Sequence, residues 1–343
     1  MKKLYFLLFV LVTHLSYAQP AVDLPSDSIL TALMHQYNIP ALGVGVIENR
    51  RIKTTKVFGE LKAGITAPIN SIFPVASLTK PIVEMTTLRL VSKGLWSLDE
   101  PLYHYWIDPD LKSDPKNKLL TTRHVLAHQT GFVNWRWLHA TGKLAFDFEP
   151  GTKTQYSGEG LEYLKHAMEA KFKMPLAAIV NKYMFNPDGM EDTHFFWDGG
   201  VQEDRYAIAH NRDAIPYEIR KNSETSAADW LMTTIHDYTL FGVNVLKRKG
   251  ITDKVWADMM RIQGNDSNAK FGLGWEVYNH MKNEELVLLH SGSDPGVRTI
   301  IVLLPKSKRG LVIFTNSDNG MALVKDIISN SLDIGKELIE RAK

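Results

Sequence analysis

The sequence predicts an α/β protein of the α+β type, with one antiparallel sheet flanked by helices and an inserted all-helical subdomain. Short apolar and β-branched segments occur near both ends of the chain, while helical patterns fill the middle and the C-terminal tail. Strands this short need each other to bury a face, so both ends are expected to contribute to one sheet. A cleft between the sheet and the helical subdomain is then the expected place for an active site.

Six segments carry the strand pattern. Two lie near the N-terminus, and a turn at Asn49-Arg50-Arg51 separates them. Four more follow residue 270, and the last two of these are joined by a hairpin turn at 306–310. The expected strands are 41–47, 52–58, 275–278, 286–289, 299–304 and 311–315. The sheet part is therefore expected to comprise about residues 30–75 and 250–343.

The helical expectations cover the remainder of the chain. The mostly apolar segment 81–93 is closed by Gly94, a typical residue just after a helix end. Two further helices are expected in the middle, at 161–172 and 228–246, and one in the tail, at 322–341. The helical part is expected to span about residues 81–247.

Composition excludes several classes of protein. The chain has 343 residues, is 44% hydrophobic and 23% charged, and has a formal net charge of +2 that Lys2 and Lys3 account for. A neutral chain without a basic cluster has little footprint for nucleic acid, so no nucleic-acid partner is expected. The sequence has no cysteine, which excludes disulfides, thiol catalysis and cysteine-ligated metals.

The first 18 residues have the features of a signal peptide. Lys2 and Lys3 precede an apolar run at 4–12, and Ser16-Tyr17-Ala18 places small residues at the positions before a cleavage site. The apolar run is shorter than the about 20 residues that a membrane span needs, so no integral membrane segment is expected after cleavage. The mature catalytic domain is expected to be 19–343, in a periplasmic or secreted protein.

A serine-x-x-lysine motif gives the first candidate for catalysis. Ser77 and Lys80 are three residues apart, which places them on one face of a helix, where the lysine can reach the serine hydroxyl. Ser113 and Ser267 begin the same pattern, but in polar, turn-like segments. Only Ser77 begins an apolar helix, and Pro81 fits the first turn of that helix. Spacing alone is equally compatible with a helix-capping serine.

Further motifs favour a catalytic role of Ser77 over a helix-capping role. Tyr156-Ser157-Gly158 follows a Pro-Gly turn, and His290-Ser291-Gly292 ends an apolar strand. With Ser77 and Lys80 they resemble the serine β-lactamase and penicillin-binding-protein superfamily, specifically its class C-like branch, which includes esterases, D-aminopeptidases and DD-carboxypeptidases. The resemblance covers about residues 30–335 and implies a β-lactamase/transpeptidase-like fold. Other segments that contribute to it are 98–101, 127–132, 187–193, 227–229 and 271–275.

The resemblance implies a role for each residue. Ser77 would be the acylated nucleophile, Lys80 its activating partner and Tyr156 the general base. His290 stands where the lysine-threonine-glycine motif of the superfamily begins. The backbone N–H groups of Ser77 and Ser293 would form the oxyanion hole. These roles agree with general chemistry, because a serine hydroxyl needs a base and the tetrahedral oxyanion needs two N–H donors.

The sequence departs from the superfamily pattern at Gly158, where an asparagine is usual. Glycine cannot provide the side-chain amide that contacts the acyl amide of β-lactams, so the sequence favours simple esters over penicillins and cephalosporins. Gly158, together with Ser291 and Gly292 of the strand motif, is assigned to substrate binding.

Four other residues have two interpretations each. Trp135 could line an acyl or sugar pocket or belong to a packed, partly exposed helical lid. Arg298 could bind a substrate carboxylate or form a surface salt bridge. His124 and His128 are four residues apart, but the glutamate of the metalloprotease motif is missing. No metal site is expected, and His128 is expected to pack or hydrogen-bond beside the active site.

The sequence thus predicts an exported serine hydrolase that cleaves an ester or amide through an acyl-Ser77 intermediate, with no cofactor and no metal. The substrate is expected to be a small-molecule ester, amide or peptide. A D-amino-acid-specific peptidase, a DD-carboxypeptidase and a β-lactamase are alternatives within this class. A non-catalytic penicillin- or peptidoglycan-binding protein is the alternative from another class.

Overall fold

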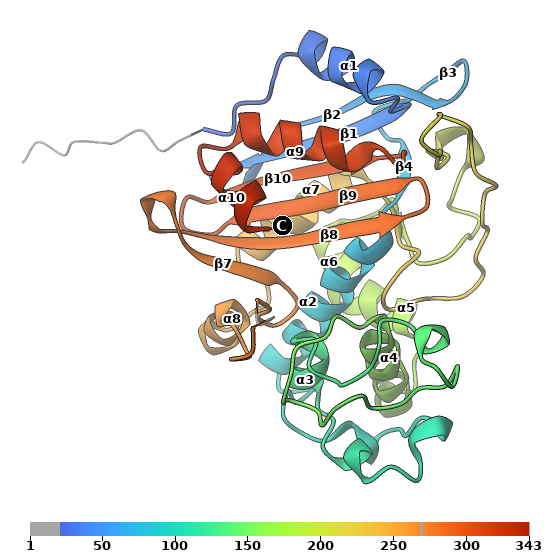
Figure 1. Ribbon diagram of the computed structural model, residues 1–343, viewed down its shortest axis with the longest axis vertical. Coiled ribbons are helices and arrows are strands. Elements are labelled where there is room, and N and C mark those ends of the chain that lie inside the picture. The colour runs from blue at the N-terminus through green and yellow to red at the C-terminus, as the bar shows by residue number, and fades with distance from the viewer. Residues whose placement is uncertain (1–20, 268–269, 343) are drawn as a thin grey trace, which may run out of the picture.

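The computed structural model describes residues 21–267 and 270–342, and its centre is a seven-stranded antiparallel sheet of order β3-β2-β1-β10-β9-β8-β7 (Figure 1). β1 lies beside β10, so the two ends of the chain meet in the middle of the sheet, which confirms the predicted fold. The strands are β1 (Ala41–Glu48), β2 (Arg51–Lys62), β3 (Ile65–Thr66), β7 (Glu276–Met281), β8 (Glu285–Asp294), β9 (Val297–Leu304) and β10 (Arg309–Thr315).

Helices cover both faces of this sheet. α1 (Asp27–Gln36), α9 (Gly320–Ser331) and α10 (Gly335–Arg341) lie on one face, and α7 (Ile235–Leu246) lies on the other (Figure 1). Alternate residues of the central strands belong to the two cores: Val302 packs with the terminal helices, whereas Ile301 packs on the α7 side. This two-sided burial explains why the strand segments read as almost continuous apolar runs.

Close approach of α7 to the sheet requires glycine in β1. A Cβ placed on Gly45 would lie 1.9 Å from Thr239 Oγ1, which belongs to α7. The Gly-interrupted pattern of the first strand is therefore a packing requirement. α7 lies within the range expected for the helical part, but it packs on the sheet against β1, β2 and β10.

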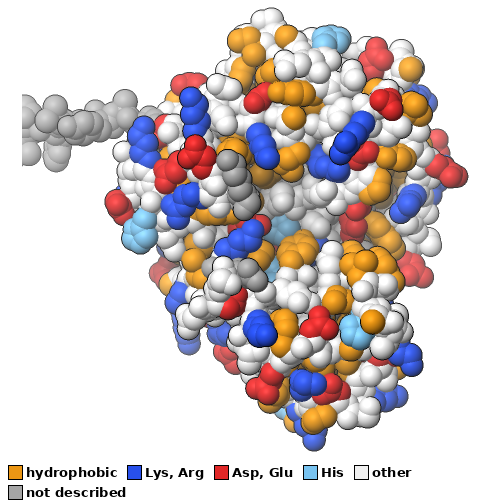
Figure 2. Space-filling model, viewed as in Figure 1, with side chains coloured by type: hydrophobic (Ala, Val, Ile, Leu, Met, Phe, Trp, Pro, Cys, Tyr) orange, Lys and Arg blue, Asp and Glu red, His pale blue; other side chains and the backbone are white. Residues whose placement is uncertain are grey.

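The helical region lies below the sheet in Figure 1, and α2 runs between the two parts. On this face of the molecule, basic and acidic side chains are scattered over both parts (Figure 2). Its helices are α2 (Thr79–Ser92), α3 (Thr122–Leu126), α4 (Gly158–Phe172), α5 (Leu176–Val180) and α6 (Asn186–Asp188), and α8 (Asp253–Met260) precedes β7. A small sheet of order β4-β6-β5 is formed by β4 (Ile72–Pro74), β6 (Met232–Thr234) and β5 (Thr193–His194). The short helical turns are η1 (Ala76–Leu78), η2 (Leu102–His104), η3 (Pro109–Leu111), η4 (Pro115–Lys118), η5 (Arg136–Leu138), η6 (Asn181–Phe185), η7 (Glu203–Arg205) and η8 (Lys282–Glu284).

One helix expectation was wrong in its extent, and the helical tail is divided into two helices. The segment 228–246 is helical only in α7, because Thr234 caps that helix by accepting from the Asp237 N–H at 3.1 Å and β6 precedes it. Residues 228–231 are instead irregular, with bends at 228 and 229 and a positive φ of 70° at Trp230. The tail 322–341 is two helices, α9 and α10, since the chain is extended at Leu332 and Gly335 packs directly on the Ile328 carbonyl of α9.

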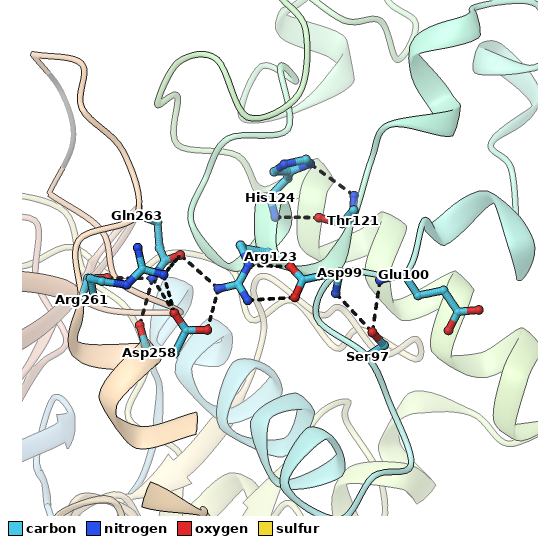
Figure 3. A network of polar contacts seen from close by, with 9 residues as sticks. All are labelled: Ser97, Asp99, Glu100, Thr121, Arg123, His124, Asp258, Arg261 and Gln263. Atoms are coloured by element: carbon cyan, nitrogen blue, oxygen red, sulfur yellow. Dashed lines mark hydrogen bonds and ion pairs between the residues drawn. The ribbon is translucent and has the colours of Figure 1, made fainter. Parts of the chain in front are cut away.

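A polar network centred on Arg123 connects the helical region to α8 (Figure 3). The Arg123 guanidinium donates to Asp99 at 2.6 and 3.0 Å, to Asp258 at 2.7 Å and to Gln263 at 3.1 Å. Arg123 and His124 lie on α3, and the loop that carries His128 follows directly after this helix. The network holds that loop in place relative to the C-terminal half of the chain, because one guanidinium bridges three separate segments.

In the part of the chain that the structure describes, no helix is long and apolar enough to cross a membrane. The predicted signal peptide, 1–18, lies outside the described residues, so export stays a prediction.

Candidate active site

The loop that carries Ser77 is held from several sides. Ser77 lies in η1, directly before α2, and is partly exposed. The residue before it, Ala76, has a φ of 49°, a conformation that non-glycine residues rarely adopt. The Val75 carbonyl accepts from Thr299 Oγ1 at 2.9 Å, and a Cβ on Gly292 would lie 2.3 Å from that carbonyl oxygen. β8 and β9 therefore fix the position of the serine directly, and this contact leaves no room for a side chain at Gly292.

Lys80 is fully buried in the first turn of α2 and points at the serine. Its Nζ donates to Ser77 Oγ at 3.0 Å and to the Ala228 carbonyl at 2.7 Å. The helix places the two side chains on one face, as the motif spacing predicts. The second contact holds Nζ in a fixed position, because Ala228 belongs to a separate segment that packs against α2.

Tyr156 lies on the other side of Lys80. Its ring centroid is 4.9 Å from Lys80 Nζ, and it precedes Ser157, the N-cap of α4. The His128 ring packs on the Tyr156 ring with centroids 4.3 Å apart, and His128 Nδ1 accepts from the Ser157 N–H at 3.2 Å. The structure thus brings Ser77, Lys80 and Tyr156 together, and it places His128 beside them as expected.

His290 also lies in this cluster, with its ring centroid 6.3 Å from that of Tyr156. His290 Nδ1 donates to the Ser291 carbonyl at 3.0 Å, so Nε2 is left as an acceptor. Burial, together with the positive charge of Lys80, lowers the pKa of His290 to about 3. His290 is therefore neutral at physiological pH and differs from the lysine of the superfamily motif, because it accepts a hydrogen bond and adds no charge.

The Nε2 atoms of His128 and His290 differ in hydrogen bonding, because one is a donor and the other is an acceptor. Since His128 Nδ1 accepts, its Nε2 carries the proton, and burial holds the pKa of His128 well below its usual range. Within residues 21–267 and 270–342, neither His128 Nε2 nor His290 Nε2 has a hydrogen-bond partner. One buried donor and one buried acceptor thus remain available beside Tyr156.

Trp135 occupies the space beside Gly158. A Cβ on Gly158 would lie 2.8 Å from the Trp135 ring, and Lys80 Nζ lies 5.9 Å from the centroid of that ring. Asn134 holds this arrangement, because its carbonyl and its Oδ1 both accept from the Gly158 N–H, at 3.0 and 2.8 Å. Glycine at this position is thus explained by the indole that fills the site.

The other residues that were predicted for substrate binding or the oxyanion hole lie on β8 and β9. Ser291, Gly292 and Ser293 lie on β8, which passes along η1. Arg298 is directed away from the serine: it donates to the Asp294 and Val297 carbonyls and lies 3.3 Å from Asp318 Oδ1. This geometry favours the salt-bridge interpretation of Arg298 over substrate binding. Ser113, in the alternative motif, is exposed in a turn between η3 and η4.

Several groups near the site were not found from the sequence. The Ala228 carbonyl has no sequence signal, because any residue has a carbonyl. Asp229 and Asp294 lie near Lys80 and hydrogen-bond to each other. Glu84, one turn after Lys80 on α2, is fully buried, and burial raises the pKa of its carboxyl well above the usual range. Glu84 could have been found from the sequence, because it is an acidic residue inside a mostly apolar helical segment.

No group of three or more His, Cys, Asp or Glu residues is arranged to hold a metal ion among the described residues. His124 is used within α3, where its Nδ1 accepts from the Thr121 N–H at 3.4 Å as part of a capping box (Figure 3).

A sheet covered on both faces, with a serine and a lysine at the start of a buried helix and a tyrosine beside them, defines the class of serine β-lactamases and penicillin-binding proteins. The chain belongs to the β-lactamase family, whose model matches residues 27–334.

Comparison with curated proteins gives three similar relatives. Esterase EstB of Burkholderia gladioli is 28% identical over 188 residues, which cover 46% of this chain and 46% of EstB. Protein flp of Staphylococcus aureus (strain MW2) is 22% identical over 84% of this chain and 62% of flp. Penicillin-binding protein 4* of Bacillus subtilis (strain 168) is 24% identical over 83% of this chain and 69% of that protein. The chain thus spans about half to two thirds of the length of these relatives.

Solved structures with the same fold include an octameric penicillin-binding protein homologue from Pyrococcus abyssi, with a TM-score of 0.73 at 18% identity, covering 89% of this chain and 78% of that chain. The D-alanine carboxypeptidase AmpC from Burkholderia cenocepacia gives a TM-score of 0.73 at 17% identity, covering 88% and 96%. At these identities the likeness establishes the fold alone.

Proposed function

We propose that this chain is an exported serine hydrolase that cleaves an ester or amide bond through an acyl-Ser77 intermediate. The observation that carries the proposal is the position of Lys80 Nζ, which is buried and lies 3.0 Å from Ser77 Oγ. Membership of the β-lactamase family and similarity to an esterase support it.

In the first half of the proposed reaction, Tyr156 takes the proton from Ser77 while Oγ attacks the substrate carbonyl carbon. Lys80 holds Oγ and its positive charge stabilises the tyrosine phenolate. The tetrahedral oxyanion is bound by the backbone N–H groups of Ser77 and Ser293. When the intermediate collapses, the proton passes from Tyr156 to the leaving alcohol or amine, and the acyl group remains on Ser77.

In the second half, a water molecule replaces the leaving group. Tyr156 takes a proton from the water as its oxygen attacks the acyl carbon, and the same proton returns to Ser77 Oγ when the carboxylic acid is released. His290 Nε2 and His128 Nε2–H provide one acceptor and one donor beside the tyrosine, so they can orient its hydroxyl and the attacking water.

Labelling with a fluorophosphonate tests the nucleophile. Mass spectrometry of the labelled protein should find the adduct on the peptide that contains Ser77, and Ser77→Ala should abolish labelling with an unchanged circular dichroism spectrum. Ser113→Ala and Ser267→Ala are matched controls that should label like the wild type. An adduct that persists in Ser77→Ala would refute the assignment.

Export has its own test. N-terminal sequencing of the protein recovered outside the cytoplasm should begin at Gln19, or show it cyclised. Recovery of a product that starts at Met1 in the cytoplasm would contradict export without affecting the proposed chemistry.

A further inference from the structure

A cavity of about 260 Å³ lies beside the nucleophile loop. Ala76, the residue before Ser77, lines it together with Met232 of β6 and Asp294 at the end of β8. Tyr156 and His290 are not among its lining residues. The cavity is therefore next to the nucleophile loop but is not part of the wall that Tyr156 and His290 form.

This position indicates which part of a substrate the cavity would receive. In the proposed reaction Tyr156 returns a proton to the leaving group, so the leaving group lies on the tyrosine side of Ser77. The acyl group is bonded to the same carbonyl carbon and extends away from the leaving group, so a cavity beside Ala76 that Tyr156 does not line is the available space for it. The cavity is thus placed to select the acyl part of the substrate.

Two carboxyl groups meet in this cavity. Asp229 comes from the irregular segment before β6, Asp294 from β8, and the two side chains hydrogen-bond to each other. Burial, followed by the neighbouring Asp229, raises the pKa of Asp294 to about 7. The pair therefore shares a proton and gains its second negative charge near neutral pH.

Other charged groups near the pair do not neutralise it by direct contact. Arg220 and Glu218 also line the cavity, and Lys80 and Glu162 contribute to the electrostatics of the pair. Among the described residues, however, no Lys or Arg forms an ion pair with Asp229 or Asp294 within 4 Å. Lys80 Nζ is already bonded to Ser77 and Ala228. Largely buried carboxyl groups that no ion pair balances are unfavourable, so the pair has the charge that a cationic ligand needs.

Part of the wall of the cavity is aromatic. Trp230, which is 40% exposed, lines it next to the carboxyl pair, and Tyr206 lines it from the loop that follows η7. Asp229 Oδ1 accepts from the Trp230 N–H at 2.8 Å, which ties the position of the tryptophan to the carboxylate. Aromatic faces attract cations, so the wall and the carboxyl pair favour the same kind of ligand.

We propose that this cavity binds a protonated amine on the acyl part of the substrate, with Asp229 and Asp294 as its hydrogen-bonding partners and Trp230 beside it. The inference rests on the proposed acyl-enzyme function and narrows its substrate class to aminoacyl esters or amides. A primary ammonium has three N–H donors, which suits two carboxyl groups facing one space.

A matched pair of esters tests the inference. p-Nitrophenyl 6-aminohexanoate and p-nitrophenyl heptanoate have the same length and differ only in an ammonium or a methyl group at the chain end. The wild type should hydrolyse the amine ester with a kcat/KM about tenfold higher, the value of one hydrogen bond to a charged group. The ratio should rise between pH 6 and 8, because the amine stays protonated while the carboxyl pair loses its proton.

Asp229→Asn and Asp294→Asn should each lower this ratio about tenfold. Asp213→Asn, which removes one exposed carboxylate that does not line the cavity, is the matched control and should leave the ratio unchanged. A wild-type ratio of one or less, or a ratio that neither cavity variant changes, would overturn the inference while hydrolysis of the heptanoate still supports the proposed function.

A binding measurement separates the two proposals if neither ester is hydrolysed. Calorimetry on Ser77→Ala with methyl 6-aminohexanoate and methyl heptanoate requires no turnover. At least tenfold tighter binding of the amine would support the cavity assignment even with the catalytic proposal refuted. Equal dissociation constants would refute the cavity assignment.

Discussion

The Trp135 indole occupies the space that a side chain at Gly158 would need, since a Cβ there would lie 2.8 Å from the ring. The position where the superfamily usually has an asparagine amide is thus filled by an apolar ring beside Lys80. The site keeps its nucleophile cluster while lacking this polar contact to an acyl amide.

The absence of this polar contact should make the enzyme prefer simple esters over cephalosporins. We expect the ratio of kcat/KM for a short-chain p-nitrophenyl ester to that for a chromogenic cephalosporin to exceed one. Gly158→Asn alone would clash with the indole, so the double variant Trp135→Ala/Gly158→Asn is the informative change. It should lower the ratio about tenfold, the value of one restored hydrogen bond. Trp137→Ala, which removes an indole that is 66% exposed, should not lower it, and a wild-type ratio below one would refute the preference.

Lys80 and Tyr156 should behave as one unit. Lys80→Met and Tyr156→Phe should each reduce kcat/KM for an ester by about 10²- to 10⁴-fold, and the double variant should lose little more than either single one. Lys182 and Tyr183 form a similar surface pair, with Nζ 5.3 Å from the ring centroid, so Lys182→Met and Tyr183→Phe are matched controls expected to retain activity. Losses that add fully in the logarithm of the rate would indicate independent roles.

His290 should act as a neutral acceptor. Because its pKa is lowered to about 3, it stays unprotonated between pH 5 and 8 and should contribute no inflection to the profile of kcat/KM in that range. His290→Phe, which removes the acceptor, should cost about tenfold, while His290→Gln, which keeps an acceptor, should retain most of the activity. If an acidic limb of the wild-type profile disappeared in His290→Gln, His290 would be titrating and this assignment would be wrong.

Glu84 should make the protein less stable at high pH. Burial raises the pKa of its carboxyl well above the usual range, so above the unfolded-state pKa the native state binds more protons than the unfolded state. Its stabilisation is therefore present in acid and is lost as the pH rises through the folded-state pKa. Relative to Glu84→Gln, the wild type should lose up to about 1.4 kcal/mol of unfolding free energy per pH unit above pH 5.

Urea unfolding at pH 5 and pH 8.5 measures this effect. Glu191→Gln, at an exposed position, is the matched control and should differ from the wild type by less than about 0.5 kcal/mol at both pH values. A difference between wild type and Glu84→Gln that does not change with pH would show that the buried carboxyl is not protonated in the native state.

Local patterns were sufficient for most of the fold. The segment 81–93 is α2 (Thr79–Ser92), and the strand expected at 299–304 is β9 (Val297–Leu304), because helix and strand periodicities are set by neighbouring residues. The pattern failed at 228–231, where contacts far along the chain hold the segment in a non-helical conformation: the Leu231 N–H donates to Thr79 Oγ1, and the Leu231 carbonyl accepts from the Val75 N–H.

That Ser77 and Lys80 share a helix face follows from their order in the chain, because a spacing of three residues sets that relation wherever the helix forms. The lack of a side chain at Gly158 is equally evident from the sequence. Three other relations appear when the chain is folded: Lys80 bonds to the Ala228 carbonyl, Trp135 fills the place beside Gly158, and Asp229 meets Asp294. Those contacts join segments that are far apart in the chain, so the periodicity of a helix or strand does not predict them. They form because the two hydrophobic cores pack together when the whole chain folds.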